Sequence, residues 1–401
     1  MIRMFLNNWI SFMKALLLIL ILGAGLSSLI ALTTSHPAAT GASIQIQNPF
    51  FINIDPMQRL LLINFENDPD SVYIGFEPQV FADSINGFGH LIIGWRKDGW
   101  VDVYCQPELH PNPDKYDIAG KGLAHMISTD LDPSYYEVGE RGVKAHYRFY
   151  DLYGREIELK IIESHPAKRK PFGLLAPMGA TAAQPSSLPL ILLHEFYFVR
   201  QKHTEFQIRI GDRLHKPDKL PMLLDMRKQY FTRYSPAPLI ANLNPEYDGF
   251  LPQIHCTIGT SELDHDNQHI NIMWKGDTAY LKKITRMNEI HPIELTFNPP
   301  IPALDNIKSG SKLKGKFQIS AHISTGKILG EYSCLYDGNK VCISMQAKRG
   351  WKPKPDKLSL RFLYTVAGVF RTWPKTYRWN AVLTPDSDGN WHMVSKWERT
   401  K

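Results

Sequence analysis

The sequence lacks the short motifs that identify the common enzyme classes. It contains no Gly-x-Ser-x-Gly elbow, no Walker loop, no dinucleotide-binding glycine fingerprint and no His-Glu-x-x-His zinc helix. The pair His194-Glu195 starts like the last of these motifs but continues as Phe-Tyr-Phe. We therefore assign no catalytic residue from motifs, and we expect neither an organic cofactor nor a bound metal.

Cysteine is also scarce. Four cysteines in 401 residues are too few for a disulfide scaffold. Cys334 and Cys342 flank a turn signal, Asp337-Gly338-Asn339. A three-residue hairpin loop centred on Gly338 would place the two cysteines opposite each other, where they could bond, whereas a two-residue loop would misalign them by one residue. The sequence leaves both a disulfide and two free thiols open.

Charge is missing from the run Ala15 to Leu32, which is just long enough, as a helix, to cross a bilayer. Arg3 and Lys14 precede this run, so the positive-inside bias keeps the N-terminus cytoplasmic and sends the following chain across the membrane. Residues 1–35 are then either a retained signal anchor or a cleaved signal peptide. In both cases we expect an extracytoplasmic body, periplasmic or extracellular, which is secreted if the segment is cleaved. Nucleic acid is not an expected partner.

Positive charge is concentrated at the C-terminal end. Residues 346–401 hold 12 Lys and Arg against 4 Asp and Glu, while the net charge of the whole chain is +7. On an exported protein such a region could face anionic lipid headgroups or an acidic polymer. The alternative is an ordinary solvated surface.

Helical periodicity is scarce after residue 45, where short runs rich in Val, Ile, Tyr, Phe and Trp are separated by Gly, Asp and Pro. This pattern predicts an all-β, mostly antiparallel body. Hairpin turns are predicted at Asp98-Gly99 and at Tyr153-Gly154, because each glycine can take the positive φ that such turns need. A short helix is predicted between Leu214 and Tyr234, and the segment from His165 to Pro189 is predicted as a long loop between two strands of one sheet.

The length of the body predicts two successive β-barrel or β-sandwich domains. We place them at residues 45–245 and 246–401, because a Pro-rich break from Pro236 to Pro252 precedes a new series of strands. That series has eight candidates, including Leu358 to Val366, which suits one barrel or sandwich.

This organisation resembles the tandem lipocalin-like proteins of the AttH and carotenoid 1,2-hydratase type. The hairpin from Gly89 to Tyr104 and the strand from Gly154 to Leu159 carry the resemblance, which spans residues 45–401. No catalytic residue of that family is matched. The resemblance therefore implies an architecture only, with a hydrophobic ligand in the mouth of a barrel.

His194 and Glu195 interrupt an apolar run from Leu190 to Val199 that is typical of a strand buried on both faces. A carboxylate in such a strand needs a partner or a proton. If the next strand pairs with this one through a three-residue loop, Glu195 lies opposite Arg209 and forms a structural ion pair. If the loop has two residues, Glu195 lies opposite Ile208, with a raised pKa suited to acid–base use. Glu77 and His90 are further single polar residues in apolar strands, each either a ligand-binding group or a satisfied structural one.

Two other segments carry candidate residues. Asp264 to His269 holds four potential metal ligands, but their spacing matches no standard site and a polar hairpin loop is the favoured interpretation. Trp373, Tyr377 and Trp379 fall on one face of an extended segment and could stack on sugar rings or an acyl chain, or belong to the core.

The leading hypothesis is an exported or membrane-anchored protein, attached through residues 15–32, that binds an apolar or amphipathic, lipid-like small molecule in a β-barrel. His194, Glu195, Glu77, His90, Trp373, Tyr377 and Trp379 are its candidate ligand-binding residues. The alternatives are an enzyme without organic cofactor, either an isomerase or hydratase or a carbohydrate-active protein, and an assembly partner in the cell envelope.

Overall fold

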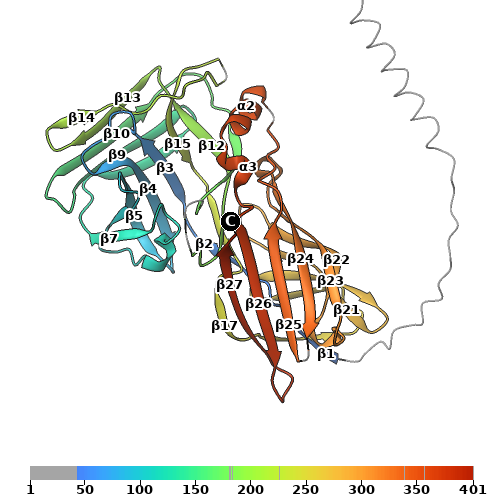
Figure 1. Ribbon diagram of the computed structural model, residues 1–401. Coiled ribbons are helices and arrows are strands. Elements are labelled where there is room, and N and C mark those ends of the chain that lie inside the picture. The colour runs from blue at the N-terminus through green and yellow to red at the C-terminus, as the bar shows by residue number, and fades with distance from the viewer. Residues whose placement is uncertain are drawn as a thin grey trace, which may run out of the picture. The chain divides into compact units, whose positions relative to one another are not determined.

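Antiparallel β-strands make up most of the structure (Figure 1). The computed structural model describes residues 43–179, 182, 184–224, 226–337, 339–355 and 357–400. Among these residues β6 and β7 pair in parallel, and the other neighbouring strands pair antiparallel. The side chains of the outer strands alternate between buried and more exposed positions, as in β10 (Glu156–Glu163), which is the period that the sequence showed. The all-β, mostly antiparallel prediction is confirmed.

The first large sheet, sheet I, has ten strands (blue to yellow-green in Figure 1). In sheet order they are β2 (Ile52–Asp55), β16 (Leu239–Leu243), β12 (Leu188–Arg200), β15 (Gln229–Ser235), β3 (Arg59–Asn64), β4 (Tyr73–Asp83), β5 (Gly87–Arg96), β6 (Val101–Cys105) and β7 (Leu123–Ser128), with β11 (Phe172–Ala176) added along β12. The predicted turn at Asp98-Gly99 joins β5 to β6 and is confirmed, with Gly99 at φ +89°.

Sheet II packs on one face of sheet I. Its five strands, in sheet order, are β14 (Arg213–His215), β13 (Thr204–Ile210), β10, β9 (Gly142–Tyr150) and β8 (Ser134–Gly139). Leu61 and Phe76 of sheet I share a hydrophobic core with Tyr147 and Leu159 of sheet II. The turn predicted at Tyr153-Gly154 joins β9 to β10 and is confirmed.

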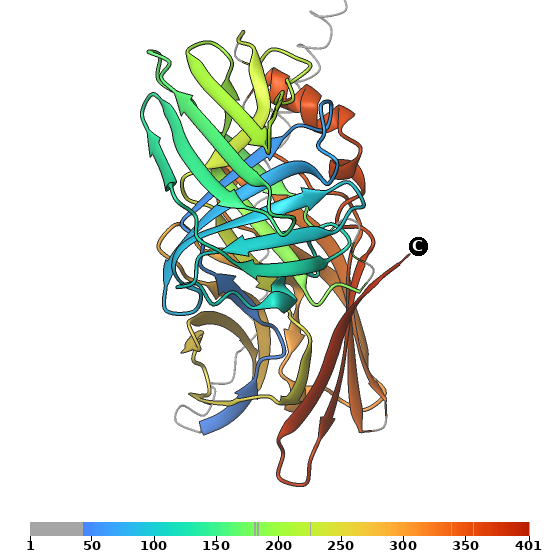
Figure 2. The ribbon, with the colours of Figure 1, turned by 90° about the vertical axis from the view of Figure 1, so that its left-hand side faces the viewer.

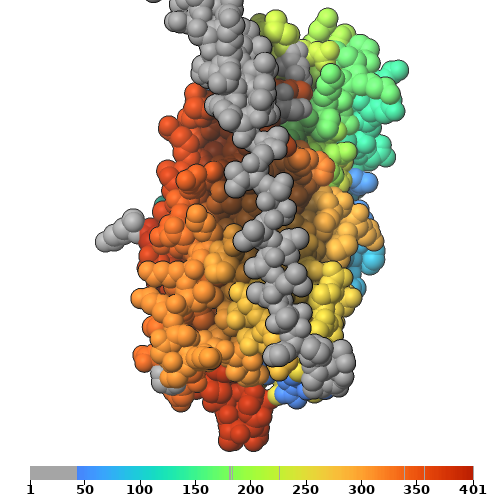
Figure 3. All heavy atoms as spheres, turned by 90° about the vertical axis from the view of Figure 1, so that its right-hand side faces the viewer, coloured from blue at the N-terminus to red at the C-terminus, as the bar shows by residue number. Residues whose placement is uncertain are grey.

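Sheet III is a ten-stranded meander in which nearly all strands pair with their neighbours in the chain. The strands in order are β17 (Tyr247–Phe250), β27 (Trp391–Arg399), β26 (Tyr377–Pro385), β25 (Lys340–Ala347), β24 (Lys327–Asp337), β23 (Lys312–Ser320), β22 (Ile293–Pro302), β21 (Thr278–Arg286), β20 (Gln268–Lys275) and β19 (Glu262–His265). The sheet curves in the turned view (Figure 2), and its residues, yellow to red, form most of the face seen in Figure 3. A separate pair, β1 (Ser43–Gln47) and β18 (Gln253–Thr257), completes the strands.

Helices are short. The structure has α2 (Leu358–Val366), α3 (Val369–Thr372) and the 3-10 turns η1 (Pro113–Tyr116), η2 (Leu304–Asn306) and η3 (Ile323–Thr325). The prediction of a strand at Leu358 to Val366 is wrong. In α2 the buried residues are Leu360 and Tyr364, one helical turn apart, while Leu358 and Phe362 are 79% and 58% exposed.

The helix predicted between Leu214 and Tyr234 is also wrong. This segment begins in β14 and ends in β15, and its described residues in between form no helix. The carboxylate of Asp218 fixes its course, because it accepts hydrogen bonds from the backbone N–H groups of Glu66 and Asn67 at 2.8 and 3.0 Å. A tertiary contact with residues distant in the chain therefore replaces the expected helix.

The prediction that the segment from His165 to Pro189 connects two strands of one sheet is wrong. Strand β10 before it belongs to sheet II, whereas β12 after it belongs to sheet I. The segment is also not a plain loop, since it contains β11, which pairs along β12.

One hydrophobic cluster contains buried residues from both sheet I and sheet III, among them Leu190 and Leu243 on one side and Phe297 and Trp379 on the other. The indole of Trp397 donates a hydrogen bond to the backbone oxygen of Asn244 at 2.6 Å. The strands of sheets I and II lie between residues 52 and 243 and those of sheet III between residues 247 and 399. The division into two domains near residue 245 stays a prediction.

Within the described residues, no helix has both the length and the apolar character that a membrane crossing requires. The run from Ala15 to Leu32 lies outside the described residues. The choice between a signal anchor and a signal peptide therefore stays a prediction.

Candidate functional site

A pocket of about 450 Å3 lies against the face of sheet I that is turned away from sheet II. Strands β2, β3, β4, β5, β12 and β16 contribute side chains, and η1, the loop after it and residues Met178, Ser186 and Ser187 complete the walls. Ile54, Leu60, Ile93, Ile191 and Ile240 make much of the lining apolar. We call this cavity the Glu77 pocket.

The alternation of strand β4 points Glu77 into this pocket. Phe76 and Val80 lie in the core between sheets I and II. Because successive side chains of a strand point to opposite faces, Glu77, Gln79 and Phe81 project to the other face, where all three line the pocket. Most residues of the strand are buried, and this burial explains why the residues around Glu77 are mainly apolar.

Glu77 is 4% exposed and forms no ion pair among the described residues. Its Oε1 accepts a hydrogen bond from Gln79 Nε2 at 2.8 Å, and its Oε2 accepts one from Trp95 Nε1 at 3.1 Å. Burial raises the pKa of Glu77 to about 7, although these two donors and the charge of Arg233 act in the opposite direction. Near pH 7 the pocket therefore contains a carboxyl group that is protonated in part of the molecules and ionised in the rest.

Further polar groups come from η1 and the loop after it. Tyr116 and Asp117 line the pocket, and burial raises the pKa of both side chains. Oδ1 of Asp117 is buried without a hydrogen-bond partner among the described residues. At another part of the wall Lys115 Nζ and Asp55 Oδ1 form an ion pair at 2.7 Å. The lining is thus amphipathic, with aliphatic side chains beside a few polar groups.

His90 does not reach this pocket. It lies on β5, and its Nδ1 is 3.0 Å from the hydroxyl of Tyr147 in sheet II. Burial, followed by the charge of Arg59, lowers the pKa of His90 to about 4. His90 therefore faces the core between the two sheets, as a satisfied structural group.

His194 and Glu195 lie at a bulge in β12, where the pairing with β11 shifts between Leu193 and Phe196. Both predicted pairings of Glu195, with Arg209 and with Ile208, are wrong, because β12 and β13 lie in different sheets. Arg209 instead pairs with Glu156 and Glu158, each at 2.9 Å.

The ring of His194 meets two other histidines. The ring centroids of His291 and His322 are 5.1 and 5.9 Å from that of His194 and 5.5 Å from each other. Burial lowers the pKa of His194, and the charge of Glu195 opposes this effect. Neither His194 nor Glu195 lines any of the five pockets described among residues 43–400.

Trp373, Tyr377 and Trp379 are buried, with exposed fractions of 2%, 0% and 0%. The indole of Trp373 donates to the backbone oxygen of Met178 and the hydroxyl of Tyr377 to that of Gly179, both at 2.8 Å. These values favour the core alternative for the aromatic ladder, which joins sheet III to the segment before β12.

The segment from Asp264 to His269 is a hairpin, as the favoured interpretation predicted. Asp266 and Asn267 form its turn with φ of +49° and +57°, and Asp264 accepts a hydrogen bond from His269 at 2.8 Å. Across the described parts of the chain, no group of three or more His, Cys, Asp or Glu side chains is arranged to hold a metal ion.

The hairpin between β24 and β25 has a two-residue loop, since Asp337 pairs with Lys340. Cys334 therefore lies opposite Ile343, and Cys342 opposite Leu335. Both cysteines are free thiols, which is the outcome expected for the two-residue alternative.

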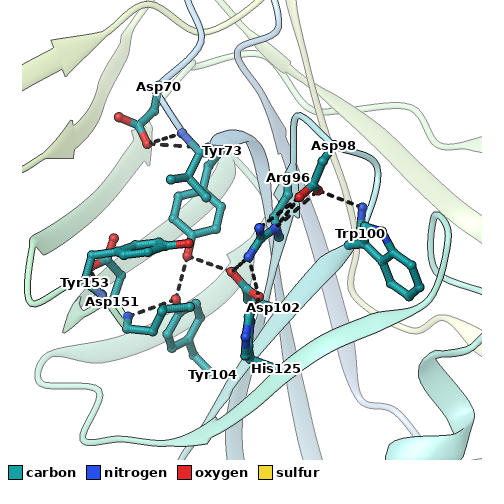
Figure 4. A network of polar contacts seen from close by, with 12 residues as sticks. Asp70, Tyr73, Arg96, Asp98, Trp100, Asp102, Tyr104, His125, Asp151 and Tyr153 are labelled. Atoms are coloured by element: carbon teal, nitrogen blue, oxygen red, sulfur yellow. Dashed lines mark hydrogen bonds and ion pairs between the residues drawn. The ribbon is translucent and has the colours of Figure 1, made fainter.

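A polar network that the sequence did not reveal surrounds Asp102 of β6 (Figure 4). This buried carboxylate accepts from the hydroxyl of Tyr73 at 3.0 Å, contacts the guanidinium of Arg96 at 3.3 Å and lies 2.8 Å from Nδ1 of His125. The hydroxyls of Tyr73 and Tyr104 are 2.6 Å apart. Asp102 is thus fully partnered and lines none of the five described pockets, so we interpret the network as structural.

Of the seven candidate ligand-binding residues, the structure places Glu77 alone in the lining of a described pocket. Sequence reasoning missed Tyr116 and Asp117, since they belong to a polar loop with no apolar pattern to interrupt. Comparisons with protein-family models, with curated proteins and with solved structures find no match to this chain.

Proposed function

We propose that the protein binds an apolar or amphipathic, lipid-like small molecule in the Glu77 pocket. The observation that carries this proposal is a pocket of about 450 Å3 that combines aliphatic walls with a buried carboxyl group. Its volume lies within the range of small-molecule sites, and its few polar groups are of the kind that orient a ligand. An apolar chain would pack on Ile93 and Ile191, and a polar end would hydrogen-bond to Glu77 or Asp117.

The proposal includes the location of the protein in the cell. The uncharged run Ala15 to Leu32 supports attachment to a membrane or export across it, with residues 43–400 on the extracytoplasmic side. The tandem lipocalin-like organisation of residues 45–245 and 246–401 is part of the same proposal. What supports it is the antiparallel meander of sheet III and a ligand pocket built on one face of sheet I.

Native mass spectrometry of the full chain extracted in mild detergent tests this function. We expect a fraction of the protein to carry a small apolar or amphipathic molecule. Ile118→Trp, which fills the pocket from its half-buried loop, should lower that fraction. Ile85→Trp makes the same change at a turn residue that is 63% exposed and outside the lining, so it should keep wild-type occupancy. A clean apo mass, or equal occupancy in the two variants, would contradict the proposal.

An enzyme without organic cofactor, an isomerase or hydratase acting on such a ligand, is the second candidate. A carboxyl group whose pKa is raised to about 7 is suited to both donating and accepting a proton near neutral pH. If the co-purified molecule is turned over by the wild type and not by Glu77→Gln, catalysis is the better description. If the wild type and Glu77→Gln both bind the molecule without converting it, the protein is better described as a carrier.

A further inference from the structure

A second pocket, of about 250 Å3, is lined by an unusual number of cations. Six of its lining residues are basic: Lys168, Arg169, Lys170, Arg200, Arg227 and Lys357. No carboxylate is found among the lining residues that the structure describes. Phe172, Tyr197 and Phe198 supply apolar walls beside this charge. We call this cavity the basic pocket.

Arg200 is the structural part of the basic pocket. It is 4% exposed, and its Nε donates to Oε1 of the buried Glu163 at 2.6 Å. Its two remaining nitrogens donate to the backbone oxygens of Ala167 and Arg141, at 2.7 and 2.6 Å. The charge of Arg200 is balanced by Glu163 and its side-chain nitrogens already donate hydrogen bonds within the protein. Arg200 therefore holds the wall of the pocket in place and is not the group that we expect to bind a ligand.

Arg169 is held differently. Its guanidinium stacks over the ring of Tyr197, 4.2 Å from the centroid; Nη1 donates to the hydroxyl of Tyr234 and Nη2 to the backbone oxygen of Gly139. Its Nε is buried and has no hydrogen-bond partner among the described residues. A buried donor without an acceptor is unfavourable, and a charged one more so. Arg169 is thus held in place by aromatic rings and two hydrogen bonds, and its Nε is the guanidinium donor that has no partner among the described residues.

The remaining cations reach the pocket from separate segments. Lys168 and Lys170 are exposed on the loop before β11, and Arg227 precedes β15. Lys357 lies at the start of α2, with its ammonium group 4.3 Å from the centre of the Phe172 ring, and brings in charge from the basic C-terminal region. Lys168 lies 3.9 Å from Glu140, but the two side chains are 84% and 80% exposed, so this contact neutralises little of the charge.

We propose that the basic pocket binds a phosphate group. Converging arginine and lysine side chains match a multiply charged tetrahedral anion, to which they donate charge-assisted hydrogen bonds. A phosphate fits the volume, and the aromatic walls leave room for an organic substituent on it. The phosphate can come from a lipid headgroup or from free phosphate in solution, and the experiment below distinguishes these sources.

This site is independent of the proposed function. The basic pocket and the Glu77 pocket share no lining residue. Both draw on β12, which contributes Ile191 to the Glu77 pocket and Tyr197 to the basic pocket. Six residues of strand separate these positions by roughly 20 Å, at about 3.3 Å per residue. Failure of either site to bind therefore leaves the other untouched.

Calorimetric titration of the full chain in an uncharged detergent tests the proposal, with inorganic phosphate as one probe and a short-chain phosphatidic acid as the other. The double variant Lys168→Gln/Lys170→Gln removes two exposed charges from the pocket and should weaken binding about tenfold. Lys282→Gln/Lys396→Gln removes the same charge from exposed positions of sheet III and should bind as the wild type does. Equal thermal melting of the three proteins shows that the fold is intact.

Binding of inorganic phosphate that is weakened about tenfold in the pocket variant alone supports the site and identifies free phosphate as sufficient. Binding of the phosphatidic acid alone, weakened to the same extent in that variant, supports the site and identifies a lipid headgroup as the source of the phosphate. Absence of binding for both probes overturns the proposal. Equal losses in the pocket and control variants also overturn it, because they show only a general effect of net charge.

Discussion

Replacing Glu77 by Gln should stabilise the folded protein at alkaline pH but not at acid pH. The folded-state pKa of Glu77 is about 7, against an ordinary value of 4.5, because the side chain is buried. Folding therefore takes up a proton between these two values, so the wild type loses stability as the pH rises from 4.5 to 7. At about 1.4 kcal/mol per pKa unit, the penalty at pH 8 amounts to about 3 kcal/mol.

The glutamine variant avoids this penalty because it has no charge to bury. It keeps one hydrogen bond from Trp95 Nε1 and can keep the contact with Gln79, whose amide is able to turn and present its oxygen. We allow about 1 kcal/mol for imperfect pairing. The expected gain is then about 2 kcal/mol at pH 8, whereas at pH 4.5, where the ionisation penalty is nearly absent, the variant should be up to about 1 kcal/mol less stable than the wild type.

Urea unfolding of the wild type and Glu77→Gln at pH 4.5, 6 and 8, followed by tryptophan fluorescence, measures this difference. Glu246→Gln removes the same charge from an exposed side chain and should show no comparable gain at any of the three pH values. A gain that does not depend on pH would refute the reasoning, since it would have to come from packing. A destabilised variant at pH 8 would show that the ionised carboxylate is compensated by a contact that the structure does not contain.

Two further results are expected. Burial and the neighbouring His194 and His322 lower the pKa of His291 to about 4, so protonation favours the unfolded chain and stability should fall as the pH drops from 6.5 to 4. Because the ring is only partly buried, we expect His291→Phe to remove about 1–2 kcal/mol of this dependence in urea unfolding, and an unchanged dependence would exclude the three rings as its source. Arg200→Met leaves Glu163 buried without its cation and should cost about 3–5 kcal/mol. Glu163→Gln in the same chain should recover part of this loss in thermal melting, and a cost below 1 kcal/mol would show that the pair contributes little.

The features that the sequence predicted correctly are local ones. The turns at Gly99 and Gly154 depend on a glycine at a positive φ between two short apolar runs, and both hairpins are present. The hairpin from Asp264 to His269 also follows from turn chemistry within a few residues, whereas the sequence left open whether Cys334 and Cys342 are bonded, and the loop length of their hairpin decides for free thiols. In each case the two partners are close in the chain, so the pattern contains all the information that is needed.

The errors arose where partners are distant in the chain or where two periods coincide. Strand β12 lies between β16 and β15, and nothing in its own residues indicates these neighbours, so the expected pairing with β13 was wrong. In the segment from Leu358 to Val366 apolar residues fall at alternate positions, as in a strand, but Leu360 and Tyr364 also have the spacing of one helix face. A single segment of nine residues cannot separate these periods, and packing on the rest of the protein decides between them.

A comparison of Glu77 with Glu163 shows why we give Glu77 a functional interpretation and treat Glu163 as structural. Both carboxyl groups are almost completely buried in the same half of the chain. Glu163 has Arg200 at 2.6 Å and a further hydrogen bond from Tyr234, the arrangement that makes a buried charge tolerable. Glu77 has two neutral donors and a pocket in front of it. Stability alone would favour a glutamine at this position at alkaline pH, by about 2 kcal/mol, and for this reason we assign Glu77, and not Glu163, to the proposed ligand site.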